Sequence, residues 1–420
     1  MKIYISGISG TAMGALALFI KQVGFDVCGS DMRSGAISSS LKEAGIDFEI
    51  GAQDGSFLKK KFDEGEVEWF LHTSALKPDH KELVLAKELG LKISKRDEII
   101  NMIIKENNLK LVGVAGTHGK STTTAMIIWA CLKLGLPISW LEGTTLGFAP
   151  AGNFDKNSKF LIYEADEFDR NFLHFFPWLS VITVVDYDHK EIYPTKEIYD
   201  EAFEQFKAQS QNLITEPYDV SNFTLAGEVR KIDAGLACNA IQKIISEAIV
   251  ENIVDKSVGN SVEKIVEILN QFPGAGRRFE RIGKNCYSDY AHLPEEISAT
   301  MNIAKEEVQK LNLNGLVVIY EPLQNMRQYN IRDKYKDCFS GADKIFWLPS
   351  FQLRENPDLA ILSPSDLIQH IDNKEIAEPA EMNSDLVGKI NFYQKNNYLI
   401  LLMSGGDADV WFRDSFGGDS

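Results

Sequence analysis

The sequence predicts an α/β protein with three domains. Strand-like apolar runs alternate with helix-like segments through almost all of its 420 residues, and this alternation is typical of parallel sheets with crossover helices. Two of the runs lead into glycine-rich turns, which begin at Gly7 and Gly116. Breaks near residues 107 and 275 divide the chain into residues 1–107, 108–275 and 276–420.

Each predicted strand is a short apolar run bounded by polar or turn residues. The runs that we predict to be buried strands are Lys2–Ser6, Val67–Thr73, Leu111–Ala115, Phe160–Glu164, Ser180–Asp186, Leu316–Glu321, Lys344–Leu348 and Leu399–Met403. A further strand is predicted over Asp26–Ser30. Helical spacing is clearest at Tyr199, Ala202, Phe203 and Phe206, which form one apolar face of a largely polar segment.

The composition excludes several kinds of partner. A formal net charge of -16 argues against nucleic acid, whose binding rests on Lys and Arg at the phosphates. The five cysteines are scattered, without the close pairs of a zinc or redox site, and fit reduced thiols in a cytoplasm. The opening strand leads directly into a glycine turn, and no apolar run approaches the length of a membrane span. We therefore expect a soluble cytoplasmic protein with no membrane partner.

The segment 111–124 is typical of a triphosphate-binding loop. It runs from a strand through a glycine turn into a helix that carries a lysine and hydroxyl groups. Gly116 and Gly119 allow a tight turn that aims backbone N–H groups inward, where the helix N-terminus attracts phosphate. Lys120 would then reach the terminal phosphates, and Ser121 would hold magnesium.

The sequence around this loop supports the interpretation. Val114 stands where the strict G-x-x-x-x-G-K-[ST] pattern has its first glycine. However, an apolar run precedes the turn and a helix-compatible segment, Thr122–Leu134, follows it, and this context is what the motif requires. An ordinary strand-to-helix turn is the alternative.

The first glycine turn, Gly7–Gly14, also permits close approach of backbone to a phosphate. Asp31 ends the next predicted strand, where an acid could accept a ribose hydroxyl. The spacing is not that of a G-x-G-x-x-G motif, and tight helix packing would explain the glycines as well. Taken alone, these residues support two interpretations equally: binding of a nucleotide such as NAD, and a turn with a purely structural role.

Two further clusters follow predicted strands of the central domain. Glu164, Asp166 and Glu167 lie where one strand ends, and His189 follows the end of another. Ligands bind at this edge of parallel sheets, and one or two carboxylates with substrate phosphates suit magnesium. We expect Glu164, His189 and the loop to converge if the strands are neighbours. A solvated acidic loop and a structural histidine are the alternatives.

The third domain begins with two arginines, Arg277 and Arg278, after a glycine turn. Guanidinium groups suit the clamping of a phosphoryl group. Asp289 and His292 follow, before a helix that Pro294 could open. Surface charge is the alternative for both clusters.

Together these segments resemble the Mur ligases, ATP-dependent enzymes that add amino acids to the UDP-linked cell-wall precursor of bacteria. The resemblance spans nearly the whole chain. The matching motifs, in the family's order, are Ala115–Lys120, Glu164–Glu167, Asp188-His189, Gly274–Phe279 and Asp289–Pro294. The opening turn and the segments Gly29–Asp31, Thr73–Ala75, Gly116–His118 and Phe172–His174 are most similar to members that join L-alanine to UDP-N-acetylmuramate.

The resemblance implies a fold and a role for each motif. The first and third domains are expected to be Rossmann-like, and the central one a P-loop mononucleotide-binding domain with a reduced sheet. The substrate-binding residues would be Gly10, Thr11, Ala12, Met13, Asp31, Ser74 and Arg327. The ATP-binding residues would be Gly116, Thr117, His118, Gly119, Lys120, Ser121, Thr122 and Asp289.

The implied catalytic residues are Lys120, Glu164, His189, Arg278 and His292. The metal ligands for Mg²⁺ would be Ser121, Glu164 and His189. A carboxylate would attack the γ-phosphate of ATP, and the amine of the incoming amino acid would then attack the acyl phosphate.

The chain departs from the family at four places. Phe203 stands where several members have a carbamylated lysine, Val229, Arg230 and Asp233 replace residues that include the adenine-binding asparagines, and the segment 211–227 is short. Near Arg327, a histidine and an arginine expected of the alanine-adding members are missing.

The expected substrates are UDP-N-acetylmuramate and L-alanine. Two alternatives stay open. One is ligation of a peptide to the same sugar in cell-wall recycling, because the Gly10–Gly14 turn, Glu321-Pro322 and Asn325 also resemble the enzymes of that reaction. The other is nucleotide binding without ligation.

Overall fold

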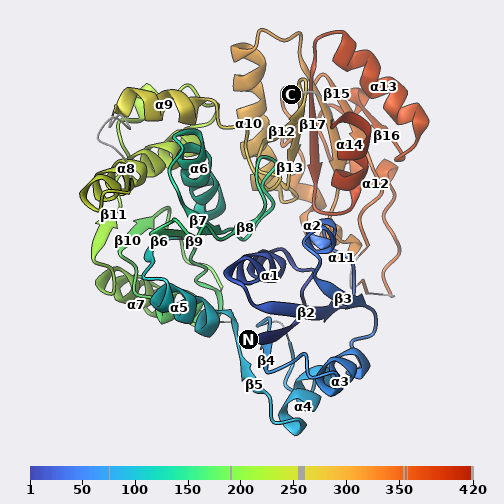
Figure 1. Cartoon of the computed structure of the whole chain (residues 1–420). Helices are drawn as coiled ribbons and strands as arrows, with labels where there is room; N and C mark the ends of the chain where they lie inside the picture. The colour runs from blue at the N-terminus through green and yellow to red at the C-terminus, as the bar shows by residue number, and fades with distance from the viewer. Residues whose placement is uncertain (75, 190–191, 254–260, 353–354, 357, 418–420) are drawn as a thin grey trace. The chain divides into compact units, whose positions relative to one another are not determined.

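The computed structural model describes residues 1–74, 76–189, 192–253, 261–352, 355–356 and 358–417. They form two compact units, the first with two sheets and the second with one, and the sheets are mainly parallel and flanked by helices (Figure 1). The first unit comprises Met1–Thr224 with Val229–Phe272, and the second comprises Leu225–Glu228 with Pro273–Ser420. The division into three domains stays a prediction. Among the described residues, no helix is long and apolar enough to cross a membrane.

The first sheet of the first unit is parallel throughout, in the order β3-β2-β1-β4-β5. Its strands are β1 (Lys2–Ser6), β2 (Asp26–Asp31), β3 (Asp47–Ile50), β4 (Trp69–His72) and β5 (Lys92–Ser94). Its helices are α1 (Thr11–Val23), α2 (Ser38–Glu43), α3 (Ser56–Asp63), α4 (Lys81–Glu88) and α5 (Arg96–Glu106). The strand order reverses beside β1, so the glycine turn after β1 lies at the switch point where α/β sheets bind ligands.

The second sheet has the order β11-β10-β6-β9-β7-β8, with only β8 antiparallel to its neighbour. Its strands are β6 (Lys110–Ala115), β7 (Ser139–Leu141), β8 (Gly152–Asn153), β9 (Phe160–Glu164), β10 (Leu179–Ile182) and β11 (Asn212–Ile214). Its helices are α6 (Lys120–Lys133), α7 (Lys196–Ala208), α8 (Glu228–Val250) and α9 (Val262–Asn270), with the 3-10 segments η1 (Phe168–His174) and η2 (Val220–Asn222). Because β6 lies between β9 and β10, the ends of all three strands meet at one edge.

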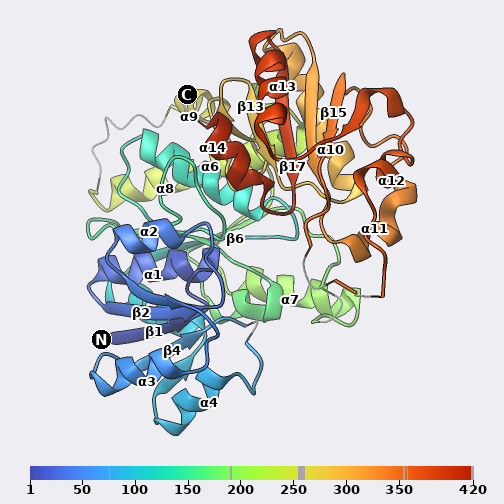
Figure 2. The same cartoon turned by 90° about the vertical axis from the view of Figure 1, so that its right-hand side faces the viewer.

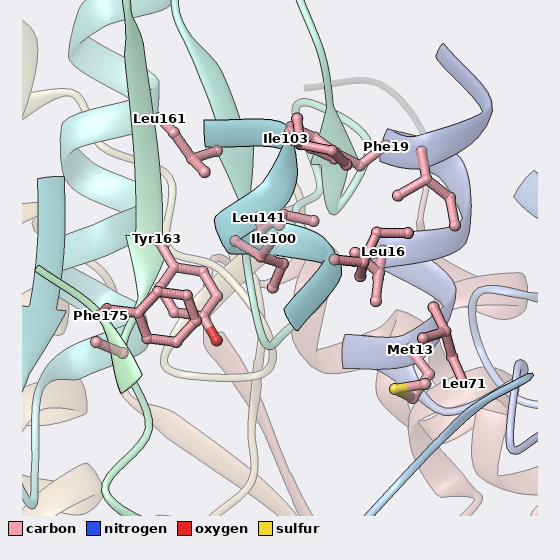
Figure 3. Close-up of a cluster of buried hydrophobic side chains, with 14 of the residues drawn as sticks. Met13, Leu16, Phe19, Leu71, Ile100, Ile103, Leu141, Leu161, Tyr163 and Phe175 are labelled. Carbon is pink, nitrogen blue, oxygen red and sulfur yellow. The ribbon is translucent and has the colours of Figure 1, made fainter. Parts of the chain in front are cut away.

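The two sheets of the first unit share one apolar core. Figure 3 shows side chains of α1, α5, β7 and β9 packed together in this core. The labelled members are Met13, Leu16, Phe19, Leu71, Ile100, Ile103, Leu141, Leu161, Tyr163 and Phe175. On the other face of the first sheet, residues of α3 and α4 pack against β1 and β4. The loops of both sheets are thus held by a single packed body.

The second unit contains one sheet, in the order β12-β13-β17-β14-β15-β16, with only β12 antiparallel. Its strands are β12 (Glu280–Gly283), β13 (Cys286–Asp289), β14 (Leu316–Glu321), β15 (Lys344–Trp347), β16 (Ala377–Pro379) and β17 (Leu399–Ser404). Its helices are α10 (Pro294–Lys310), α11 (Asn325–Ile331), α12 (Pro364–Ile368), α13 (Ser384–Lys395) and α14 (Ala408–Phe416), with η3 (Arg332–Lys334) and η4 (Lys374–Ile376). Helix α10 packs on one face, and α13 and α14 pack on the other (Figure 2).

The α/β fold class is confirmed, and several strands have the predicted bounds, among them Phe160–Glu164 and Leu316–Glu321. The strand predicted over Ser180–Asp186 is wrong at its end, because β10 stops at Ile182. Beyond that point the backbone turns to support the phosphate loop, since Val184 O accepts the N–H of Thr117 at 2.7 Å. The helix predicted to begin at Thr122 begins at Lys120.

Candidate active site

The loop between β6 and α6 has the geometry of an anion cradle. Gly116 and Gly119 have positive φ angles of 147° and 84°, which side chains disfavour. A Cβ on Gly116 would lie 2.0 Å from Thr183 Oγ1. Gly119 caps α6 without a side-chain hydrogen bond, and the first intrahelical bond runs from Thr123 N to Gly119 O. The N–H groups at the start of α6 therefore remain for a ligand.

Side chains after β10 hold this loop in place. Thr117 Oγ1 donates to Asp186 O at 2.6 Å, accepts from Asp186 N at 2.8 Å and lies 2.6 Å from Tyr199 Oη. Thr183 Oγ1 donates to His118 O at 2.5 Å, and the His118 side chain is exposed. Thr117 thus acts as a tether from inside the loop.

Lys120 is folded back across the loop. Its Nζ donates to Gly116 O at 2.6 Å and lies 3.3 Å from Thr117 O. It also contacts both carboxylate oxygens of Glu167, at 3.1 Å and 2.8 Å. The ammonium therefore lies between the loop carbonyls and Glu167, and its contact with phosphate stays a prediction.

The two glutamates of the acidic motif at the end of β9, Glu164 and Glu167, face different parts of the site. Glu164 accepts from Gly143 N at 3.2 Å and lines a cavity of about 130 Å³. Glu167 is fully buried and faces Lys120, with His189 Nε2 3.6 Å from its Oε1. Burial raises the pKa of the Glu167 carboxyl, and the nearby Lys120 charge opposes that shift. Glu167 is thus the acid that joins Lys120 to His189.

Glu167 belongs to the acidic motif that the sequence shows, but the sequence assigns it no separate role. Its proximity to Glu164 was the available signal, although spacing alone did not reveal which acid faces the loop. His189 has a positive φ of 53°, and its N–H donates to Asp188 Oδ1 at 2.7 Å. The two residues after His189 lie outside the described residues.

The predicted metal ligands belong to three neighbouring strands of the second sheet: Ser121 follows β6, Glu164 ends β9 and His189 follows β10. Ser121 is buried in the first turn of α6, with Thr122 beside it. Within the described parts of the chain, no group of three or more His, Cys, Asp or Glu side chains is placed to hold a metal. A magnesium ion held mainly by phosphate oxygens needs only one or two protein carboxylates, which this edge of the sheet offers.

The first glycine turn is organised by Asp31. Its carboxylate accepts from Ser9 N at 2.9 Å and from Arg33 N at 3.4 Å. Gly10 caps α1, which starts at Thr11. The other predicted substrate residues of this unit have different surroundings. Ala12 lines the cavity beside Glu164, and Met13 is buried in the core. Ser74 is exposed and forms a hydrogen bond with Asp169. Ala75 lies outside the described residues.

Two ion pairs connect the first sheet to the acidic motif. Lys95 pairs with Asp169, and Arg96 Nη2 lies 3.4 Å from Asp166 Oδ2. Arg96 also lines the cavity at Glu164. The turn that begins α1, through Ala12, and the end of β9 thus border the same cavity.

In the second unit, the predicted residues divide into exposed and structural groups. Arg278 is exposed, whereas Arg277 stacks on Tyr290 with its guanidinium 4.6 Å from the ring centre. The Asp289 carboxylate accepts from Phe279 N at 2.7 Å, and also from Ala291 N and Thr300 Oγ1. Burial raises the pKa of Asp289 despite these hydrogen bonds. Asp289 therefore fixes the backbone beside Arg278.

The remaining predicted residues of this unit lie near helix starts. His292 is buried, with Nδ1 3.0 Å from Tyr290 O and 3.3 Å from Glu296 Oε2, so its contacts are those of a loop anchor. Arg327 is half-buried in α11.

The departures from the family are also visible. Phe203 is 1% exposed and packs against Phe172 and Tyr199. Arg230 and Asp233 are buried in α8, and a Cβ built on Gly119 would lie 2.5 Å from Asp233 Oδ1. The phosphate loop is thus backed by a carboxylate where the family has an asparagine.

These features place the chain in the class of α/β proteins with a phosphate-binding loop. Comparison with known proteins narrows the class. A model described as Mur ligase family, catalytic domain, matches residues 2–108. The UDP-N-acetylmuramate–L-alanine ligase of Clostridium perfringens is 30% identical over 413 residues, covering 87% of this chain and 86% of that protein. The protein of the same name from Porphyromonas gingivalis is 27% identical and covers 90% of this chain and 94% of its own.

Solved structures agree in fold. The UDP-N-acetylmuramate–alanine ligase of Thermotoga maritima has a TM-score of 0.75 at 22% identity, covering 99% of this chain and 98% of that one. A murein peptide ligase of Psychrobacter arcticus has a TM-score of 0.56 at 21% identity, with the same coverage. The chain belongs to the Mur ligase family.

Proposed function

We propose that this protein joins L-alanine to UDP-N-acetylmuramate, with ATP activating the sugar carboxylate and Mg²⁺ assisting. The cluster of Lys120, Glu167 and His189 at the mouth of the phosphate loop carries the proposal. The choice of substrates is supported by the names of the similar proteins from Clostridium perfringens and Porphyromonas gingivalis.

The residues present fit a triphosphate. Gly116 and Gly119 permit the positive-φ turn of the loop, and the start of α6 offers backbone N–H groups without a side-chain cap. Lys120 provides the positive charge that a reaction between a carboxylate and a phosphate requires. Magnesium, when bound, further screens the two anions from each other.

Each protein group then has a defined task. The loop N–H groups orient the phosphates, and Lys120 neutralises charge on the oxygens of the transferred phosphoryl group. Ser121 and Glu164 are proposed magnesium ligands, with His189. Asp31 keeps the first turn shaped for the UDP-sugar diphosphate. The roles of Arg278, His292 and Arg327 stay predictions that substitution can test.

The alternative of peptide ligation rests on a likeness at Glu321-Pro322 and Asn325. These side chains are used within the fold: the Asn325 amide donates to Ala360 O at 3.0 Å and accepts from Leu362 N at 2.9 Å. Glu321 accepts from Ser404 Oγ at 2.5 Å. Glu321 and Asn325 thus have contacts within the fold, and the names of the similar proteins favour L-alanine as the acceptor.

The test is phosphate release from ATP and Mg²⁺ in the presence of UDP-N-acetylmuramate and one amine at a time. L-alanine, L-serine, glycine and the tripeptide L-alanyl-γ-D-glutamyl-meso-diaminopimelate form the panel. We expect the highest kcat/KM with L-alanine. Phosphate release with the tripeptide alone would select the recycling reaction. The absence of phosphate release with every amine of the panel would support nucleotide binding without ligation.

A further inference from the structure

Glu167, the last residue of the Glu164–Glu167 motif, contacts Lys120 directly. It is fully buried, and its side chain is 1% exposed. Its backbone carbonyl accepts from Tyr193 Oη at 2.6 Å, which fixes the position of the residue beneath the loop. A buried carboxylate is stable only with a cation or several donors beside it. Lys120 and His189 provide this environment.

Lys120 has the complementary arrangement. Its side chain is 13% exposed, and its Nζ contacts two loop carbonyls and both oxygens of Glu167. The ammonium is therefore directed by acceptors of the protein itself. A triphosphate in the loop would bring several more negative charges to the same cation.

We propose that Glu167 is a positioning residue that holds Lys120 across the phosphate loop and competes with the incoming phosphates for its ammonium group. This inference rests on the proposed function in one respect, namely that the loop binds a nucleoside triphosphate or diphosphate. When the phosphates bind, Lys120 turns toward them, and Glu167 keeps His189 as its neighbour. Lys120 thus approaches the phosphates from one fixed direction, and nucleotide affinity is lowered because Glu167 competes with the phosphates for its ammonium group.

Removing the charge of Glu167 should have opposite effects on nucleotide affinity and on turnover. Glu167→Gln keeps the shape of the side chain and removes its charge, so ADP and ATP should bind roughly tenfold more tightly, within the usual range of coupling between sites. The value of kcat should fall, because Lys120 and His189 lose the group that orients both of them. A purely structural role would lower stability without this separation of affinity from kcat.

The experiment measures ADP binding by calorimetry in buffer without divalent cations, so that no metal ligand enters the comparison. Glu247→Gln is the matched control, because Glu247 pairs with Lys110 at the opposite end of the same strand, β6. We expect unchanged affinity for Glu247→Gln and tighter binding for Glu167→Gln. A second comparison uses Lys120→Met, alone and with Glu167→Gln. In the Lys120→Met protein, Glu167→Gln should have no further effect on ADP affinity, because Glu167 acts through Lys120.

The outcomes are distinguishable. Equal or weaker ADP binding by a folded Glu167→Gln protein would overturn the role of Glu167 and leave the proposed function standing. If Glu167→Gln does not fold, Glu167→Asp decides, because its shorter side chain withdraws the carboxylate from Lys120 and should also tighten binding; unchanged affinity would then overturn the inference. Failure of the unaltered protein to bind any nucleotide would overturn the proposed function, and this inference with it.

Discussion

Replacing Glu82 with alanine should destabilise the first unit more than any surface change of equal size. Glu82 lies on α4, is 1% exposed and accepts hydrogen bonds beneath the first glycine turn. Its donors are Tyr4 Oη at 2.7 Å, Ser6 Oγ at 2.6 Å, Ser30 Oγ at 2.6 Å and Gln53 Nε2 at 3.2 Å. Ser6 is the last residue of β1 and Ser30 the last but one of β2, so the carboxyl group connects the ends of the two strands beside the turn.

The magnitude follows from those contacts. A buried donor left without a partner costs about 1–3 kcal/mol, and neighbouring losses are not additive. For four donors, of which some can rotate toward one another, we expect Glu82→Ala to lower the free energy of unfolding by about 3–6 kcal/mol. This is a large part of the roughly 5–15 kcal/mol that stabilises a typical domain.

The assay is urea unfolding followed by tryptophan fluorescence, with hydrogen exchange of peptides from β1 and β2 to locate the loss. Glu88→Ala is the control, because Glu88 is exposed on the same helix and should change stability by less than about 0.5 kcal/mol. Glu82→Gln, which keeps one acceptor oxygen, should fall between the two and should weaken binding of UDP-N-acetylmuramate. A Glu82→Ala protein within about 1 kcal/mol of the unaltered protein would refute the reasoning.

Three further predictions concern the loop, a core position and the thiols. Lys120→Ala should abolish phosphate release while UDP-N-acetylmuramate still binds, as measured by calorimetry; retained turnover would show that the loop is assigned wrongly. Phe203→Ala should lower the free energy of unfolding by about 3–5 kcal/mol in urea titrations, because this ring is buried among other aromatic rings, and a neutral result would contradict that packing. Burial raises the pKa of Cys28, Cys131 and Cys286 to about 12 from 9.0, so the folded state holds these protons more tightly than the unfolded state does. The urea midpoint should therefore fall as pH rises from about 9 to about 12, and a midpoint that is constant or rises over this window would disagree.

The local parts of the site could be predicted from the sequence. The strand, the glycines and Lys120 are contiguous, and their chemistry is set by neighbours along the chain. The α/β class was also accessible, since short apolar runs with β-branched residues, such as Leu316–Glu321, favour strand over helix. The end of β10 was not, because Val184 leaves the strand to accept a hydrogen bond from Thr117, a contact between distant segments.

Side-chain direction was the second limit. Glu164 and Glu167 are three residues apart, and the chain changes from strand to 3-10 helix just after them. Spacing alone could not show that Glu167 faces Lys120 while Glu164 turns to Gly143. Similarly, Asp289 was predicted to contact nucleotide, and nothing in its sequence context revealed that backbone N–H groups occupy its oxygens.

The central claim is that this protein activates a carboxylate of UDP-N-acetylmuramate by phosphoryl transfer from ATP. Its most direct test uses substrate labelled with ¹⁸O in that carboxylate, with L-alanine as acceptor and the released phosphate analysed by mass spectrometry. An acyl phosphate intermediate transfers one carboxylate oxygen to the phosphate, so the account predicts one ¹⁸O atom per phosphate released. Release of unlabelled phosphate at the same rate as the amide product forms would contradict it.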